Sequence, residues 1–279
     1  MNIEELKAKL YNKKSISSPH PAEIIDLNRN LMQELTYFEE EIRRSGKWDD
    51  VCKEILREPL EVIFSAIEVN KGKHLTLLTK TNLDDIQVLA EQVLREGIMG
   101  DFFEAGVFRG GVAILLRAIQ CKNAESHRKV WAADTFAGIP APDFERESAA
   151  EIVSFLAMRL AGSFSTTLED VKENFSRFNL LDENVIFIKG NFEKTFPEIN
   201  NICLSLLRLD CQYGHSSKIA LEYLYPHLAV GGILLMNDYD YADYWGAKEA
   251  IDLYRRQHSI QAPIHLKGTT GYWRKEEHI

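Results

Sequence analysis

The chain has 279 residues, of which 45% are hydrophobic, and its formal net charge is −9. This length is enough for one large domain with an appendage or for two small domains. The acidic balance and the absence of a long Lys/Arg cluster argue against a nucleic-acid partner. The four cysteines form no CxxC pair, which favours a reducing compartment. The start MNIEELKAKL lacks the apolar core of a signal peptide, and no apolar run reaches the roughly 18 residues of a membrane helix, so we expect a cytoplasmic protein with no membrane partner.

Residues 1–75 have the pattern of helices. Apolar residues recur at steps of three and four in LMQELTYFEEEIRRSG and in WDDVCKEILREPLEVIFSAIEV. Ser45, Gly46 and Pro59 interrupt the pattern. We predict that this region is a helical cap or oligomerisation element of a homo-oligomer, ahead of a main domain that covers residues 76–279.

The main domain alternates short apolar runs with helical stretches. The runs are GDFFEAGV, KVWAADTF, NVIFIKG, LSLLRLD and GGILLMND, and the predicted helices cover residues 83–97, 111–120, 167–179, 216–228 and 244–258. This alternation is typical of a parallel sheet with helices on both faces. Two further strands, in APIHLKG and GYWRK, flank a Gly-Thr-Thr-Gly turn and predict an antiparallel hairpin at one edge. The fold class is therefore a doubly wound α/β sheet with an N-terminal helical extension.

Ligands of such sheets bind beyond the carboxyl ends of the strands. In FFEAGVFRGG a strand ends at Glu104, Gly106 permits a tight turn, and Gly110 and Gly111 open a helix. The pattern is not GxGxxG, which weakens a dinucleotide interpretation, and a glycine turn without a ligand is an equal alternative. Asp134 ends the next strand, where an acidic side chain suits the two hydroxyls of a ribose or simply a turn. Together the two features favour a nucleoside ligand.

Two later strands also end on polar residues. Asp210 follows one strand, and Asn237 and Asp238 follow the next. Two carboxylates and an amide oxygen from adjacent strand ends suit magnesium or calcium. The alternative is that these side chains form caps and turns, for which Asp and Asn are also common.

These stretches resemble the macrocin O-methyltransferase (TylF-type) family, whose members use S-adenosylmethionine to methylate sugar hydroxyls of natural products. The similarity runs from about Thr76 to Arg274. EAGVFRGG resembles the family's E-T-G-V-W-R-G-G, and ADTFAGIPAPD resembles A-D-S-F-E-G-L-P-x-P-D. The resemblance implies a Rossmann-like class I methyltransferase sheet and a small-molecule acceptor from secondary metabolite biosynthesis.

The resemblance also implies which residues contact the cofactor. Asp134 would hold the ribose, and Asn191 and Phe192 would lie near the adenine, with Asn191 in place of a family tryptophan. Residues from about 141 to 166 would form a lid over the acceptor. The whole implied set is Thr76, Leu77, Glu104, Ala105, Gly106, Val107, Phe108, Asp134, Thr135, Phe136, Gly138, Asn191, Phe192 and Asp210.

The chain departs from the family at two functional positions. Where the family has L-D-G-D-x-Y-E-S-T, this chain has LDCQYGHSS. Asp210 keeps the place of a magnesium ligand, but Gln212 replaces the family's proposed general base. The family's second pair of aspartates is Asn237 and Asp238 here. The implied metal set therefore has one neutral ligand, and we expect weakened magnesium binding.

Methyl transfer to an alcohol requires alignment and removal of the hydroxyl proton. The amide of Gln212 orients a hydroxyl but does not take its proton. His215, three residues further on, is the candidate base, because an imidazole has a suitable pKa. Three alternatives stay open: His215 is an exposed helix residue, the acceptor is acidic enough to need no base, or the protein binds the cofactor with altered, metal-independent or lost transfer.

Overall fold

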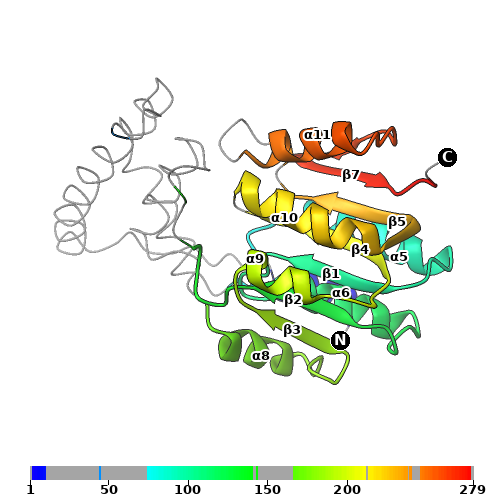
Figure 1. Ribbon diagram of the computed structural model, residues 1–279. Helices are drawn as coiled ribbons and strands as arrows, with labels where there is room; N and C mark the ends of the chain where they lie inside the picture. Colours follow the sequence, from blue (N-terminus) through cyan, green and yellow to red (C-terminus); the bar gives the residue numbers. More distant parts are fainter. Residues whose placement is uncertain are drawn as a thin grey trace.

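A seven-stranded sheet forms the centre of the protein (Figure 1). The computed structural model describes residues 2–10, 44, 74–140, 143, 166–211, 213–237, 239–240 and 246–277. The strand order is β3-β2-β1-β4-β5-β7-β6. The strands are β1 (Asp101–Ala105), β2 (Val130–Asp134), β3 (Val185–Lys189), β4 (Leu204–Leu209), β5 (Leu228–Met236), β6 (His265–Lys267) and β7 (Thr270–Arg274).

The direction of the strands confirms the predicted topology. β1 to β5 are parallel, and β7 is antiparallel to both β5 and β6. The last two strands are therefore the expected hairpin at one edge of a doubly wound sheet.

Helices cover both faces of the sheet (Figure 1). One hydrophobic cluster packs α1 (Ile3–Leu10), α5 (Lys80–Arg95), α6 (Gly111–Lys122) and α8 (Leu168–Arg177) against the sheet. The other cluster contains α10 (Gly214–Leu224) and α11 (Ala247–Gln257), with α9 (Phe192–Thr195) and the 3-10 turns η1 (Phe196–Glu198) and η2 (Tyr225–His227). Neighbouring strand residues point to opposite faces: Phe102 belongs to the first cluster and Phe103 to the second. This two-sided burial explains why the strands are almost continuously apolar.

One predicted helix ends earlier than expected. The helix predicted over residues 216–228 is α10, which ends at Leu224, and Leu228 already belongs to β5. Pro226 lies between them in the first positions of η2. A proline has no N–H to continue an α-helix and its ring clashes with the preceding turn, so the chain leaves the helix before it.

The first helix belongs to the sheet domain. Ile3, Leu6 and Leu10 are buried in the same cluster as α5 and α6. The backbone N–H of Leu75 donates to the carbonyl of Leu10 at 3.0 Å, so the two described ends of the predicted extension lie side by side. Apart from Arg44, residues 11–73 lie outside the described part, and so does nearly all of the predicted lid. The cap, the oligomerisation role and the lid stay predictions.

Gly106 brings the carboxyl ends of β1 and β4 against each other. Its φ is +88°, and a Cβ atom at this position would lie 2.1 Å from the carbonyl oxygen of Asp210. The backbone N–H of Asp210 in turn donates to the carbonyl of Ala105 at 2.8 Å. The glycine is thus required for contact between two backbone segments, because any side chain would force them apart.

We predict that Gly106→Ala destabilises the protein by about 3 kcal/mol or more. Left-handed strain contributes about 1–2 kcal/mol, and the collision with Asp210 adds an overpacking cost of about 1–3 kcal/mol. Gly97 is the matched control, since its φ is +69° but a Cβ there meets nothing within 4 Å. Gly97→Ala should lose only the strain contribution. Urea unfolding measures both, and equal losses would show that the contact with Asp210 is unimportant.

Candidate active site

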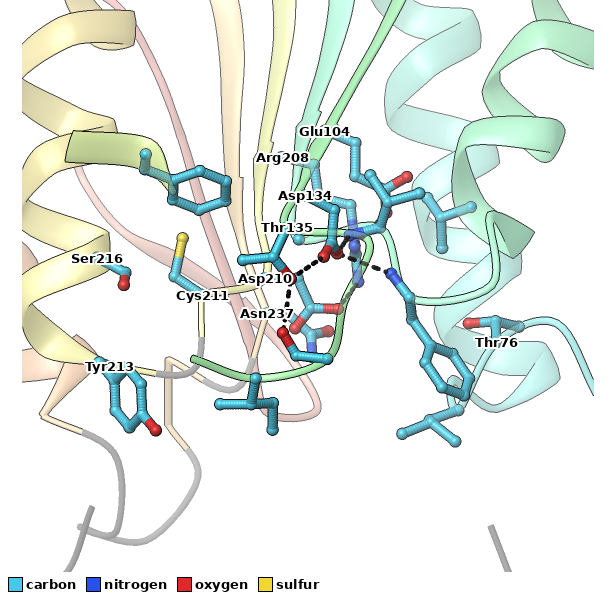
Figure 2. A pocket seen from close by; sticks show the side chains of 18 of the residues that line it. Thr76, Glu104, Asp134, Thr135, Arg208, Asp210, Cys211, Tyr213, Ser216 and Asn237 are labelled. Atoms are coloured by element: carbon cyan, nitrogen blue, oxygen red, sulfur yellow. Dashed lines mark hydrogen bonds and ion pairs between the residues drawn. The ribbon is translucent and has the colours of Figure 1, made fainter. Parts of the chain in front are cut away.

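A cavity of about 570 Å³ opens at the carboxyl edge of the sheet (Figure 2). Its size lies in the range of about 300–1,000 Å³ that is usual for small-molecule sites. Figure 2 shows Thr76 on one side of the cavity, Cys211, Tyr213 and Ser216 on the other, and the strand-end residues between them. The predicted residues that line it are Thr76, Leu77, Glu104, Gly106, Val107, Phe108, Asp134, Thr135, Gly138, Asn191, Phe192, Asp210 and Asn237.

Asp134, at the end of β2, organises the turn that follows β1. Its Oδ2 accepts hydrogen bonds from the backbone N–H groups of Val107 and Phe108, at 2.7 and 3.2 Å. Its Oδ1 accepts from the N–H of Phe136 at 3.1 Å. The carboxylate therefore fixes the loop that lines the cavity.

Asp134 still has room for another donor. The hydroxyl of Thr135 lies 3.2 Å from Oδ1 of Asp134 but only 2.6 Å from the carbonyl of Gly138. A hydroxyl has a single hydrogen to donate, and the shorter distance indicates that Thr135 donates it to the carbonyl of Gly138. A carboxylate has about four acceptor positions. One position of Oδ1 thus remains for a hydroxyl of a ligand, which is compatible with the predicted ribose contact.

A buried ion pair joins β1 and β4 at the bottom of the cavity. Glu104 lies directly opposite Arg208 in the strand register. Both side chains are almost completely buried, and Nη1 of Arg208 donates to Oε1 of Glu104 at 2.5 Å. Nη2 of Arg208 donates to Oδ2 of Asp210 at 2.8 Å. Loss of hydration on burial, which outweighs the attraction to Arg208, raises the pKa of Glu104 to about 8.

The second oxygen of Glu104 is unusual. Oε2 is buried, and no described residue forms a hydrogen bond with it. A buried carboxylate oxygen without a partner costs free energy, and it is most often found where a ligand or an ion supplies the partner. Because Glu104 lines the cavity, a cation bound near this oxygen would supply the missing partner and favour the ionised carboxylate.

The predicted metal ligands are only partly described. Asp210 and Asn237 both line the cavity, and the N–H of Asn237 donates to the carbonyl of Leu209 at 2.8 Å. Asp238 lies outside the described residues. Within the described ranges no three His, Cys, Asp or Glu side chains are grouped as a metal site. The magnesium site therefore stays a prediction.

The structure does not bring His215 to the cavity. Its Nε2 contacts Oε1 of Glu193, and it faces a separate hollow that is also lined by Lys218 and Tyr254. The next residue, Ser216, lines the main cavity instead. Side chains of adjacent helix residues point about 100° apart, which explains why His215 and Ser216 face different hollows. Gln212 lies outside the described residues, so its role stays a prediction, and His215 is not among the described residues that line the main cavity.

Two predicted cofactor residues pack behind the cavity wall. Ala105 is fully buried in the cluster that contains α10. Phe136 is buried on the other face, where its ring packs edge-on against Phe187 at 6.1 Å. Asn191 does line the cavity, but its side chain also caps α9 by accepting from the N–H of Glu193.

Several residues of the cavity wall were not predicted from the sequence. Tyr213 donates its hydroxyl to the carbonyl of Pro140 at 2.9 Å. Burial raises the pKa of the Cys211 thiol, so the thiol stays protonated. Arg208 had a visible signal, since it is the one charged residue within the strand sequence LSLLRL and stands two residues before Asp210, on the same side of the strand. The missed residues are Leu75, Leu78, Val112, Ile139, Pro140, Arg208, Cys211, Tyr213, Ser216 and Ala247.

The sheet order, the terminal hairpin and the acidic cavity define the class as a Rossmann-like methyltransferase. The O-methyltransferase NovP has the same fold, with a TM-score of 0.69 and 28% identity over 87% of this chain and 99% of that one. The calicheamicin methyltransferase CalS11 shares the fold at a TM-score of 0.57 and 20% identity, over 94% of this chain and 98% of that one.

Sequence comparison gives the family. Residues 70–275 match the macrocin-O-methyltransferase (TylF) family. The chain is 35% identical to a tetracenomycin-C 4'-O-methyltransferase of Streptomyces olivaceus that acts on the 8-demethyl-8-(2,3-dimethoxy-alpha-L-rhamnosyl) form, over 71% of this chain and 75% of that protein. It is 34% identical to the mycinamicin III 3''-O-methyltransferase of Micromonospora griseorubida, over 72% and 78%. The chain belongs to the TylF family and is an O-methyltransferase. No described helix is long and apolar enough to cross a bilayer.

We predict that Glu104 makes the stability of the protein depend on pH. A carboxyl group with a raised folded pKa binds its proton more tightly in the folded state than in the unfolded one. Its contribution is fully present below the unfolded pKa, near 4.5, and is lost as the pH rises through about 8. The free energy of unfolding should fall over this range by a few kcal/mol at most.

Urea unfolding at several pH values between about 5 and about 8 measures this slope. Glu104→Gln, which does not ionise, should remove most of it. Glu173→Gln is the control, because Glu173 is exposed and, among the described residues, its ion pair is with Arg177 one turn along the same helix. A Glu104→Gln variant that kept the wild-type slope would assign the pH dependence to other groups.

Proposed function

We propose that the protein transfers the methyl group of S-adenosylmethionine to a sugar hydroxyl of a small-molecule natural product. The observation that carries this proposal is the cavity itself, where three carboxylates at the strand ends face one space that Arg208 also lines. The relatives support the choice of acceptor, since one methylates a rhamnosyl tetracenomycin and another is a demethyldecarbamoylnovobiocin O-methyltransferase from Streptomyces niveus, 33% identical over 72% of this chain and 75% of that protein.

The residues present fit the cofactor. S-adenosylmethionine has an ammonium group, and such a cation would favour the ionised form of Glu104, whose unpartnered Oε2 would then be its acceptor. At the other end, Oδ1 of Asp134 has a position left for a ribose hydroxyl. Phe192, stacked on Phe196 at 4.3 Å, offers an aromatic edge near the predicted adenine position. We therefore place the methionine end at Glu104 and the nucleoside end toward Asp134 and Phe192.

The cofactor supplies an electrophilic methyl group, and the chain supplies alignment. The rigid sheet edge and the Asp134-bonded turn hold the donor side in one geometry, which lowers the entropy cost of an in-line displacement. Asp210 lies 38% exposed at the cavity and can accept a hydrogen bond from the acceptor hydroxyl. We assign no proton transfer to His215, because it pairs with Glu193 outside this cavity.

Magnesium would be held by Asp210 and Asn237, together with Asp238. The donors fit a hard cation only weakly, because Asn237 is neutral and the charge of Asp210 is partly balanced by Arg208. Bound magnesium would lower the pKa of an acceptor hydroxyl. We therefore propose that the ion, if used, binds more weakly than at a site with three carboxylates.

The first test is methyl transfer itself. The protein is incubated with S-adenosylmethionine and a panel of macrolides, tetracenomycins and aminocoumarins, each offered as the glycoside and as its sugar-free aglycone. We expect a single added methyl group on at least one glycoside, seen by mass spectrometry, with one S-adenosylhomocysteine per product. Aglycones should stay unchanged. Transfer to aglycones alone would contradict the sugar as acceptor, and binding without transfer to any acceptor would favour a cofactor-binding role.

The second test concerns the metal. Asn237→Asp should raise the affinity for Mg²⁺ about tenfold, because a carboxylate replaces a neutral ligand. Asn191→Asp is the matched control, since it adds the same charge elsewhere on the cavity wall. Calorimetric titration with Mg²⁺ should separate the two variants. An equal gain in both would show a general effect of charge, and no gain in Asn237→Asp would mean that this side chain does not face the ion.

A further inference from the structure

Arg208 lies below the cavity and contacts carboxylates on two neighbouring strands. Its side chain is 2% exposed, although it belongs to the cavity wall. Nη1 contacts Oε1 of Glu104 on β1, and Nη2 contacts Oδ2 of Asp210, the residue that follows β4. Among the described residues, each arm of the guanidinium therefore contacts one oxygen of a different carboxylate.

We infer that Arg208 is a positioning residue, which holds Glu104 and Asp210 by one oxygen each and so directs their other oxygens to the ligands. The inference rests on the proposed cofactor site. It explains why Oε2 of Glu104 is buried at the cavity without a described partner, since Oε1 alone is committed to Arg208. Oδ1 of Asp210 is likewise not part of the ion pair and is the oxygen left for an acceptor hydroxyl or an ion.

The geometry requires an arginine, and not only a positive charge. A guanidinium is planar and presents separate donors in a fixed fork, so it can orient two carboxylates at once. A lysine ammonium is a single charged centre on a flexible stem, and it would compensate the charge without fixing both groups. Charge compensation and positioning therefore predict different results for Arg208→Lys.

Binding of S-adenosylmethionine and of S-adenosylhomocysteine distinguishes an effect of charge from an effect of side-chain orientation. S-adenosylmethionine carries a sulfonium charge that S-adenosylhomocysteine lacks, but both have the same ammonium group and ribose. A change of charge in the cavity alters the ratio of the two affinities, whereas a loss of orientation weakens both. For Arg208→Lys we expect both affinities to fall about tenfold, which corresponds to one oriented charged hydrogen bond, with their ratio unchanged within about twofold.

Arg117 provides the structural control. It is another buried arginine, and its side chain is 2% exposed. Its Nη2 lies 2.6 Å from Oδ2 of Asp182, and neither residue lines the cavity. Arg117→Lys should lower the melting temperature, as Arg208→Lys does, but leave both affinities at the wild-type values. Calorimetric titration and thermal unfolding of all three proteins give the comparison. Wild-type affinities in Arg208→Lys, or a changed ratio between the two ligands, would overturn the inference.

A second pair of variants covers the case in which Arg208→Lys does not fold. Asp210→Asn keeps an oxygen for Nη2 of Arg208, and Asp210→Ala removes it, although both remove the charge. S-adenosylhomocysteine should bind more weakly to the alanine variant, and equal binding would contradict the positioning role. If the wild-type protein bound neither cofactor form, the proposed function and this inference would fall together. If the wild-type protein bound both cofactor forms and the variants bound them with the same affinity, the proposed function would stand and the positioning role of Arg208 would be wrong.

Discussion

The pairing of β1 with β4 is the constraint on which the site depends. Placing two carboxylates below one cavity is costly unless a cation lies between them, because charged groups lose their hydration on burial. The parallel register puts Glu104 beside Arg208, and the alternation of side chains along the strand puts Asp210 on the same side. Arg208 then reaches both carboxylates without leaving the interior. The charge balance of the site is therefore a consequence of strand order.

Both backbone and side-chain contacts fix the turn that follows β1 at this edge of the sheet. Gly106 lets the turn after β1 touch the backbone of Asp210, and Asp134 bonds the N–H groups of the next two residues of that turn. Together they hold the cavity wall in one conformation, which is the preorganisation that a displacement reaction requires. Strands β1, β2 and β4 thus each contribute one part of a single rigid surface.

The carboxylates predicted for the methyl donor line the cavity, whereas one position predicted for the proton and one predicted for the metal carry neutral amides. The carboxylates at Glu104 and Asp134 face the cavity, but a glutamine and an asparagine stand where the family has aspartates, at Gln212 and Asn237. Glu193 engages the imidazole of His215 on another surface. An acceptor whose hydroxyl is oriented by Asp210, or activated by a weakly held ion, is consistent with this combination.

The sequence by itself determined the class of the fold, the strand ends that meet at the cavity, and many of the residues that line it. Apolar periodicity reports burial and so predicted the sheet, whereas glycine and aspartate at strand ends also suit plain turns and caps, and the resemblance to the TylF family singled them out. Only the tertiary structure decided which neighbours each group has. Asp210 was expected as a metal ligand, yet its first partner is Arg208; Ala105 and Phe136 were expected at the cofactor and lie in the core. Partners from other strands and the direction of a side chain on a helix depend on packing across long sequence separations, which local patterns do not contain.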